Sequence, residues 1–200
     1  MKGKLLTLLL LSQFCLAIAQ TSGLIVKQEA ANKLVPVKMS CNPSIISNIT
    51  FVGDNRMIGS FDGSRCNIGL KDGIILSTGH IQDAVGPNNL ASKSSKDSLV
   101  GDLDLEKVLA TSNVTHDAAV LEFDFVAVSD TLNIRYVFAS EEYLEFVHTN
   151  YNDLFGCFLS GPGISGPYSK QSVNIATVPG TQSYVGVNTI NKSNNTFRKY

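Results

Sequence analysis

The sequence of 200 residues lacks the spacings that mark the common catalytic and metal-binding motifs. It has no Cys-x-x-Cys pair, which argues against a zinc ribbon or a thiol redox centre. It also has no Gly-x-Ser-x-Gly turn of the serine hydrolases, and His80, His116 and His148 lack the ligand spacing of a zinc site. The sequence therefore gives no support for a hydrolase triad or for zinc.

Long apolar runs are also scarce, and the longest one lies at the start of the chain. Lys2 and Lys4 precede this run, and the small-x-small pattern Ala17-Ile18-Ala19 follows it. This order predicts a secretory signal peptide over residues 1–19. No later segment approaches the roughly 20 apolar residues of a membrane helix. We therefore expect a secreted or outer-surface protein with no membrane span in the mature chain.

Positive charge is not in excess over negative charge. The chain has 16 Lys and Arg against 17 Asp and Glu. Loss of Lys2 and Lys4 with the leader leaves 14 against 17, a net charge of −3. Because binding to a nucleic acid or an anionic membrane needs a basic surface, we expect neither as a partner.

Three cysteines remain after cleavage, and an odd number leaves at least one of them without a partner in the same chain. Cys41 and Cys66 flank a pair of predicted strands, so we predict a disulfide between them. Cys157 lies within an apolar run and is expected to be buried as a small hydrophobic residue.

Short runs rich in Val, Ile and Phe alternate with turn-forming residues after a polar lead-in segment at residues 20–35. This pattern predicts an all-β, antiparallel, jelly-roll-like β-sandwich over residues 36–200. At most one short helix is expected, within residues 102–109, with Asp102 or Asp104 as its N-cap. The predicted strands are 45–52, 73–77, 120–128, 132–139, 154–160, 173–178 and 184–189.

The two predicted strands on either side of residues 129–131 alternate apolar and polar side chains, as half-buried strands do. A hairpin between them places Phe123 opposite Tyr136 on one face and Asp124 opposite Arg135 on the other. A shift of one residue would set apolar against polar side chains, so the pattern favours this register.

Glu122 and Asp124 fit the alternating acids of some β-sandwich glycosidases, which need a third, outer acid as well, so that one carboxylate acts as nucleophile and another as the acid. The next residues on the same strand face are Val126 and Val128, so no further acid follows. We therefore favour two acids on a solvated sheet face, with Arg135 opposite, and predict no catalytic residues.

Oxygen-bearing side chains gather in two places that strand pairing would bring together. Glu141 and Glu142 follow one predicted strand, and Asn152 and Asp153 precede another. Carboxylate and amide oxygens are calcium ligands, and Asp117 is a further candidate. The same residues also suit a turn and a strand start, and they lack EF-hand spacing. Calcium is thus the one cofactor that the sequence predicts.

Several motifs closely resemble the choice-of-anchor L domain of bacterial, largely Bacteroidetes, surface and secreted proteins. Four ordered motifs carry this resemblance most strongly, and three shorter segments look like the amino-terminal part of the domain. The resemblance runs from about residue 47 to residue 191. The four motifs are residues 117–125, 135–143, 152–156 and 159–163, and the shorter segments are 67–70, 73–79 and 84–88.

The resemblance implies a surface role without a defined activity. Family members usually continue with further strands and a sorting or anchoring module, which implies a carboxy-terminally incomplete domain here. We expect a non-catalytic binding or adhesion-type module whose loops 142–153 and 87–97 meet a surface glycan or a protein ligand. The alternatives are a carbohydrate-active enzyme that uses Glu122, Asp124 or Glu142, and a purely structural spacer.

Overall fold

The computed structural model describes residues 23–39, 45–87, 90, 93, 95, 98–110, 114–143 and 145–191. Strands make up most of the regular secondary structure in this part of the chain. The α-helices within it are α1 (Ala31–Lys38) and α2 (Leu103–Leu109), and the 3-10 helices are η2 (Asn55–Met57), η3 (Ile81–Val85) and η4 (Ser169–Gln171). The strands are β1 (Ile25–Gln28), β2 (Ile46–Val52), β3 (Ile58–Asp62), β4 (Asp72–Leu76), β5 (Val120–Phe125), β6 (Leu154–Phe155), β7 (Phe158–Leu159), β8 (Val173–Asn174) and β9 (Val185–Gly186). No helix in these residues is both long and apolar enough to cross a bilayer.

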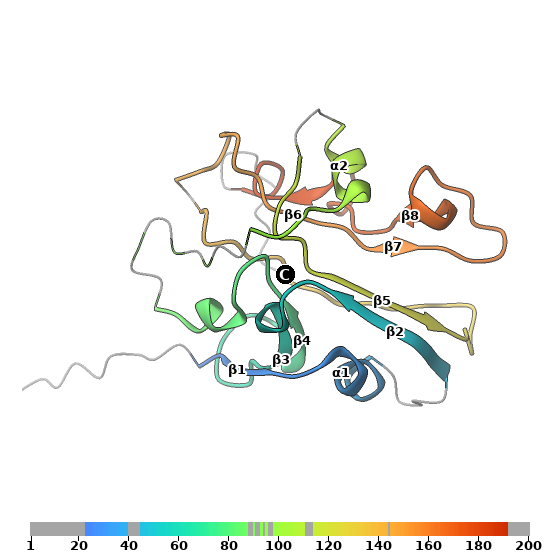
Figure 1. Cartoon of the computed structure of the whole chain (residues 1–200), viewed down its shortest axis with the longest axis horizontal. Coiled ribbons are helices and arrows are strands. Elements are labelled where there is room, and N and C mark those ends of the chain that lie inside the picture. The colour runs from blue at the N-terminus through green and yellow to red at the C-terminus, as the bar shows by residue number, and fades with distance from the viewer. Residues whose placement is uncertain are drawn as a thin grey trace, which may run out of the picture.

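All of the strand pairs among the described residues are antiparallel, and they form four small sheets. The largest has the order β1-β3-β4, and the others pair β2 with β5, β6 with β9 and β7 with β8. Figure 1 shows α1 beside the three-stranded sheet, with α2 and the short strands β6 to β8 at the other end of the molecule. The predicted all-β, antiparallel class is confirmed, while its sandwich arrangement stays a prediction.

Helix α1 supplies one side of the hydrophobic core. Ala31, Leu34 and Val35 are buried, and their spacing places them on one helix face. Leu34 belongs to one cluster with Ile58 of β3. The sequence predicted at most one short helix and a lead-in without structure here, whereas residues 25–38 contain both β1 and α1. Helix α1 escaped prediction because Ala30 provides no side-chain cap and Pro36 lies inside the helix.

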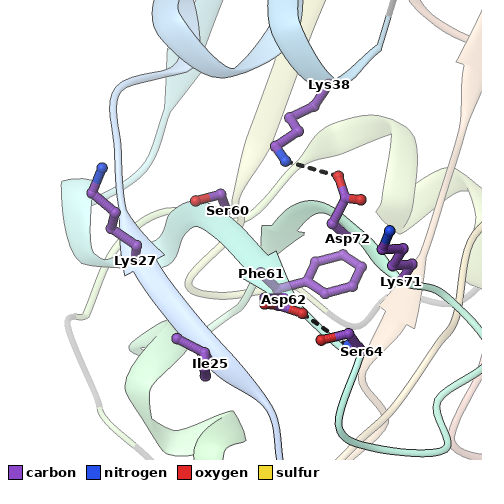
Figure 2. A pocket seen from close by; sticks show the side chains of 9 residues that line it. All are labelled: Ile25, Lys27, Lys38, Ser60, Phe61, Asp62, Ser64, Lys71 and Asp72. Carbon is purple, nitrogen blue, oxygen red and sulfur yellow. Dashed lines mark hydrogen bonds and ion pairs between the residues drawn. The ribbon is translucent and has the colours of Figure 1, made fainter.

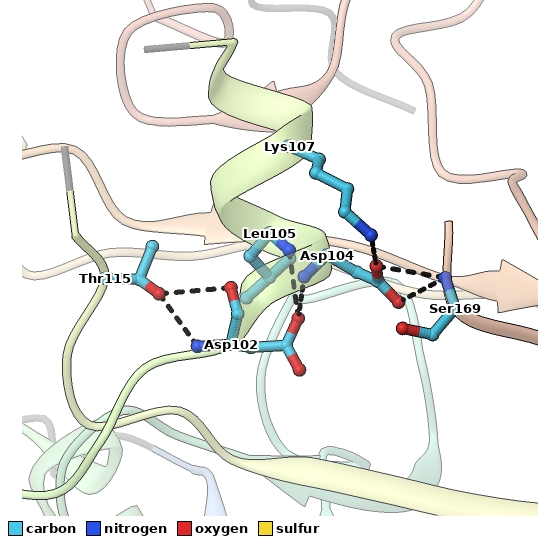
Figure 3. Close-up of polar contacts among 6 residues, drawn as sticks. All are labelled: Asp102, Asp104, Leu105, Lys107, Thr115 and Ser169. Atoms are coloured by element: carbon cyan, nitrogen blue, oxygen red, sulfur yellow. Dashed lines mark hydrogen bonds and ion pairs between the residues drawn. The ribbon is translucent and has the colours of Figure 1, made fainter. Parts of the chain in front are cut away.

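Helix α2 has the cap that the sequence predicted. The Asp102 carboxylate accepts hydrogen bonds from the backbone amides of Asp104 and Leu105, both at 2.9 Å. Asp104 is itself buried, and its carboxylate accepts from the Ser169 amide and from the Lys107 ammonium at 2.9 Å (Figure 3). The first turn of α2 therefore fastens the distant η4 segment to the helix.

The predicted hairpin is wrong, because β5 pairs with β2 and residues 126–139 contain no strand. Asp124 accepts a hydrogen bond from the Asn48 side chain at 2.6 Å, across an irregularity in the β2 register. Arg135 instead donates to the Gly69 carbonyl at 3.1 Å. Strand β2 also has apolar and polar residues on opposite faces. It can therefore pair with β5 in place of the predicted strand 132–139, which is nearer in the sequence.

The predicted strand at residues 154–160 is divided in two. β6 pairs with β9 and β7 pairs with β8, and the chain turns between them at Gly156 and Cys157. Buried Ala176, Val185 and Val187 lie close to these short strands in the sequence. Cys157 is a half-buried free thiol, and burial raises its pKa.

We predict that Asp102→Ala lowers the free energy of unfolding by about 1 kcal/mol, because two amides of α2 lose their acceptor. Asp102→Asn keeps an oxygen acceptor and should recover most of this loss. Urea unfolding followed by circular dichroism measures both, with the exposed Asp130→Ala as a surface control. An equal loss in the Ala and Asn variants would contradict the capping role.

Candidate functional site

Two of the predicted calcium ligands come together where the segment 140–153 begins and ends. The Ser140 hydroxyl lies 3.4 Å from an Asp153 carboxylate oxygen and accepts a hydrogen bond from the Glu142 amide at 3.1 Å. Ser140 therefore links the two ends of the segment and places the Glu142 and Asp153 carboxylates near each other.

Burial and mutual repulsion disfavour the charged forms of this pair. Burial raises the pKa of Glu142, the Asp153 charge raises it further, and the Asp153 backbone amide lowers it. Burial also raises the pKa of Asp153, against a lowering by the Ser140 hydrogen bond. The Glu142 Oε2 atom is buried and has no hydrogen-bond partner among the described residues. A cation, or a proton, would relieve both effects.

Glu141 has different surroundings from Glu142. Burial raises its pKa, the positive charge of Lys93 lowers it, and the negative charge of Asp83 raises it. Lys93 and Asp83 belong to the segment that follows β4, far from Glu141 in the sequence. Residues 141–143 lie in a turn, and the Oε2 atom of Glu141, like that of Glu142, is buried without a hydrogen-bond partner among the described residues.

The remaining two predicted ligands are used by the fold itself. Asn152 accepts from the Asn188 amide at 2.9 Å and donates to the Tyr184 hydroxyl at 3.2 Å. Asp117 accepts from the Leu99 amide at 2.6 Å. Within the described residues, no group of three or more Asp, Glu, His or Cys side chains is placed to hold a metal ion. Glu142 and Asp153 are thus the part of the predicted site that the structure assembles.

The residues between this pair form a hydrogen-bonded loop that presents an aromatic side chain. Tyr151 is 64% exposed, and its ring meets Phe146 edge-on at a centroid distance of 5.4 Å. The Asn188 side chain accepts from the His148 amide at 2.6 Å and donates to the Thr149 carbonyl at 3.3 Å. This side chain fixes the loop from outside it, and no local sequence signal identifies that role.

Tyr143, the other aromatic residue near the acidic segment, has a structural role. Its hydroxyl donates a hydrogen bond to the Ile190 carbonyl. Burial raises its pKa to about 12. Tyr151 is therefore the tyrosine of this segment that a ligand could reach.

Other predicted features fall partly or wholly outside the described residues. The signal peptide at residues 1–19 and Cys41 lie outside them, as does much of the loop 87–97. Cys66 is a free thiol here, 3.3 Å from the Gly63 carbonyl, and its bridge to Cys41 stays a prediction.

The paired antiparallel strands and the hydrogen-bonded loop define an all-β module. The family model of the choice-of-anchor L domain matches residues 23–199, nearly the whole chain. The chain belongs to this family, which points to a secreted or surface-anchored protein. No curated protein and no solved structure shows significant similarity to it.

Without added cations, we predict that Glu142→Gln stabilises the chain relative to the wild type as the pH rises. A carboxyl group whose pKa is raised by folding contributes its full stabilisation of the fold at pH values below its pKa in the unfolded chain, here about 4.5. That contribution is lost as the pH rises through the folded pKa, whereas glutamine does not titrate. Thermal unfolding from pH 4 to pH 7 in chelator measures the difference, with the exposed Glu145→Gln as the matched control. A difference that stays constant with pH would contradict the assignment.

Proposed function

We propose that the chain is a non-catalytic binding or adhesion-type module of a secreted or cell-surface protein. Its ligand is a surface glycan or a surface protein, and its contact surface is the loop from Glu142 to Asp153. The observation that carries the proposal is the exposed Tyr151 on a loop that Asn188 holds in place.

A fixed loop is suited to binding because little conformational entropy remains to be lost when a ligand arrives. Three further bonds inside the loop support this. The Thr149 amide and hydroxyl both donate to the Phe146 carbonyl, at 3.1 and 2.6 Å, and the Tyr151 amide donates to the Thr149 hydroxyl at 3.1 Å. Tyrosine offers a flat apolar ring and a polar tip, so it contacts sugars and protein surfaces equally well.

The surroundings of Glu122, Asp124 and Glu142 give less support to the competing hypothesis of a carbohydrate-active enzyme. Glu122 forms an ion pair with Lys170 at 3.0 Å, and Asp124 accepts from Asn48. Glu142 lies beside Asp153 on a different segment. Glycoside hydrolysis needs two carboxylates that flank one bond, with one of them free to act as nucleophile or base. Glu122 and Asp124 are already engaged with cationic or amide partners, which favours the binding module.

We predict that Tyr151→Ala abolishes or strongly weakens ligand capture, by about tenfold or more, while Tyr151→Phe retains most of it. The measurement is binding to a glycan array and to proteins on intact neighbouring cells, with the exposed Val128→Ala as a surface control. A spacer without a ligand would show no capture by the wild type. Release of reducing sugar from a polysaccharide panel, lost in Glu142→Gln, would instead establish the enzyme.

We also propose that calcium is the ion that neutralises Glu142 and Asp153. Two close carboxylates and a buried, unpartnered carboxylate oxygen support this choice, because calcium takes oxygen ligands from side chains, backbone carbonyls and water. The bound ion would hold together the two ends of the Tyr151 loop. Recognition would then depend on calcium even though no ligand touches the ion.

Calcium should therefore raise the unfolding temperature, by the equivalent of about 1.4 kcal/mol at ten times its dissociation constant. Asp153→Asn should remove most of this response, and Asp117→Asn should leave it unchanged because Asp117 is bonded to the Leu99 amide. Differential scanning calorimetry with calcium and with chelator tests both variants. Equal responses in the two variants would exclude Glu142 and Asp153 as the site.

A further inference from the structure

A shallow depression of about 340 Å³ lies on the three-stranded sheet, far in the sequence from the Tyr151 loop (Figure 2). Strands β1, β3 and β4 contribute to its wall, with the end of α1 and the turn between β3 and β4. Its volume is at the small end of the range for ligand sites, which suits one ring better than an extended chain. The lining residues are Ile25, Lys27, Lys38, Ser60, Phe61, Asp62, Ser64, Lys71 and Asp72.

The three lysines of this depression differ in how their charge is compensated. Lys38 pairs with Asp72 at 2.8 Å, and Lys27 pairs with Glu29 at 2.7 Å. Lys71 is exposed and forms no ion pair within 4 Å among the described residues, although its charge reaches Asp62 and helps to lower the pKa of that carboxyl group. Lys71 therefore offers an ammonium group that a bound anion could neutralise.

An aromatic ring lies in the same depression. Phe61 stands opposite Gly73 in the β3–β4 ladder, and a Cβ atom at Gly73 would lie 2.9 Å from the Phe61 ring. The missing side chain thus gives the ring room to rest on β4. A flat apolar surface of this kind fits the C–H face of a sugar ring.

Hydroxyl-binding groups also line the depression. The Asp62 carboxylate accepts from the Ser64 amide at 2.9 Å, and hydrogen bonds from the Ser64 side chain and backbone lower its pKa. The Asp72 carboxylate uses one oxygen to accept from Lys38. The Asp72 carboxylate has a second oxygen, and the exposed Ser64 lines the same depression. These groups can accept from and donate to the hydroxyls of a small polar ring.

We propose that this depression binds a single anionic sugar unit, a uronate or a sulfated sugar, with its charge on Lys71 and its ring on Phe61. The negative group gives Lys71 the direct ion pair that Lys27 and Lys38 already have, and the apolar ring face covers Phe61. A neutral sugar can make only the contact with Phe61, and a simple anion can make only the contact with Lys71. This site shares no residues with the Tyr151 loop, so each of the two proposals can be tested without the other.

Titration of the isotope-labelled chain with glucuronate, glucose 6-sulfate, glucose and sodium sulfate tests the proposal by chemical-shift changes in the amides of β3 and β4. Both anionic sugars should bind at least about tenfold more tightly than glucose or sulfate. Lys71→Gln should weaken them by about three- to tenfold, as expected for a partly exposed charged contact, and Lys71→Arg should restore them.

Two further variants separate binding from folding and from general charge. Lys33→Gln removes the same charge from an exposed lysine outside the depression and should leave the affinity unchanged. Phe61→Leu keeps an apolar side chain and should weaken the sugars but not sulfate. Equal binding of sulfate and the anionic sugars, unchanged affinity in Lys71→Gln, or no shifts in these amides would each overturn the proposal. Tyr151→Ala should have no effect here, which keeps this result distinct from the test of the loop.

Discussion

Every buried backbone amide needs a hydrogen-bond acceptor. Strands of only two residues pair few amides with a neighbouring strand, so the other amides around them need acceptors of another kind. Side-chain oxygens of asparagine and aspartate fill this role in the irregular part of the chain. Asn174 accepts from the amides of Cys157 and Ala176, which follow β6 and β8. Asn152 and Asn188 do the same for the Tyr151 loop. The placement of the candidate contact surface therefore depends on hydrogen bonds from side chains to backbone.

The same need decides what the acidic residues can do. Asp102, Asp104 and Asp117 accept from backbone amides, so these carboxylates hold the chain in place and are not free for chemistry. Glu142 differs because one of its oxygens is buried without a hydrogen-bond partner among the described residues, and a second carboxylate lies nearby. That arrangement fits a site for a proton or a cation better than a catalytic acid pair. Because Glu142 and Asp153 lie at the two ends of the loop, their charge state is coupled to the way in which the loop presents Tyr151.

Local patterns in the sequence predicted local features well. The run around Asp102 predicted both α2 and its cap, because a capping side chain and the amides that it binds are two or three residues apart. Short apolar runs between turn-forming residues predicted the positions of β2, β4 and β5. Alternation of apolar and polar residues failed for the hairpin. It shows that a segment suits a strand, but not which of two alternating segments will become its partner.

Composition, periodicity and capping in the sequence determined an all-β antiparallel domain and the capped helix α2. The resemblance of several motifs to the choice-of-anchor L domain predicted the family, which the family match confirms. Only the tertiary structure decided that β5 pairs with β2, that Lys93 approaches Glu141, and that Asn188 fixes the Tyr151 loop. These contacts join residues about 40 to 80 positions apart. The physical reason is that a distant contact forms only when the whole fold offsets the entropy of closing the chain between its partners, and no local pattern records that balance.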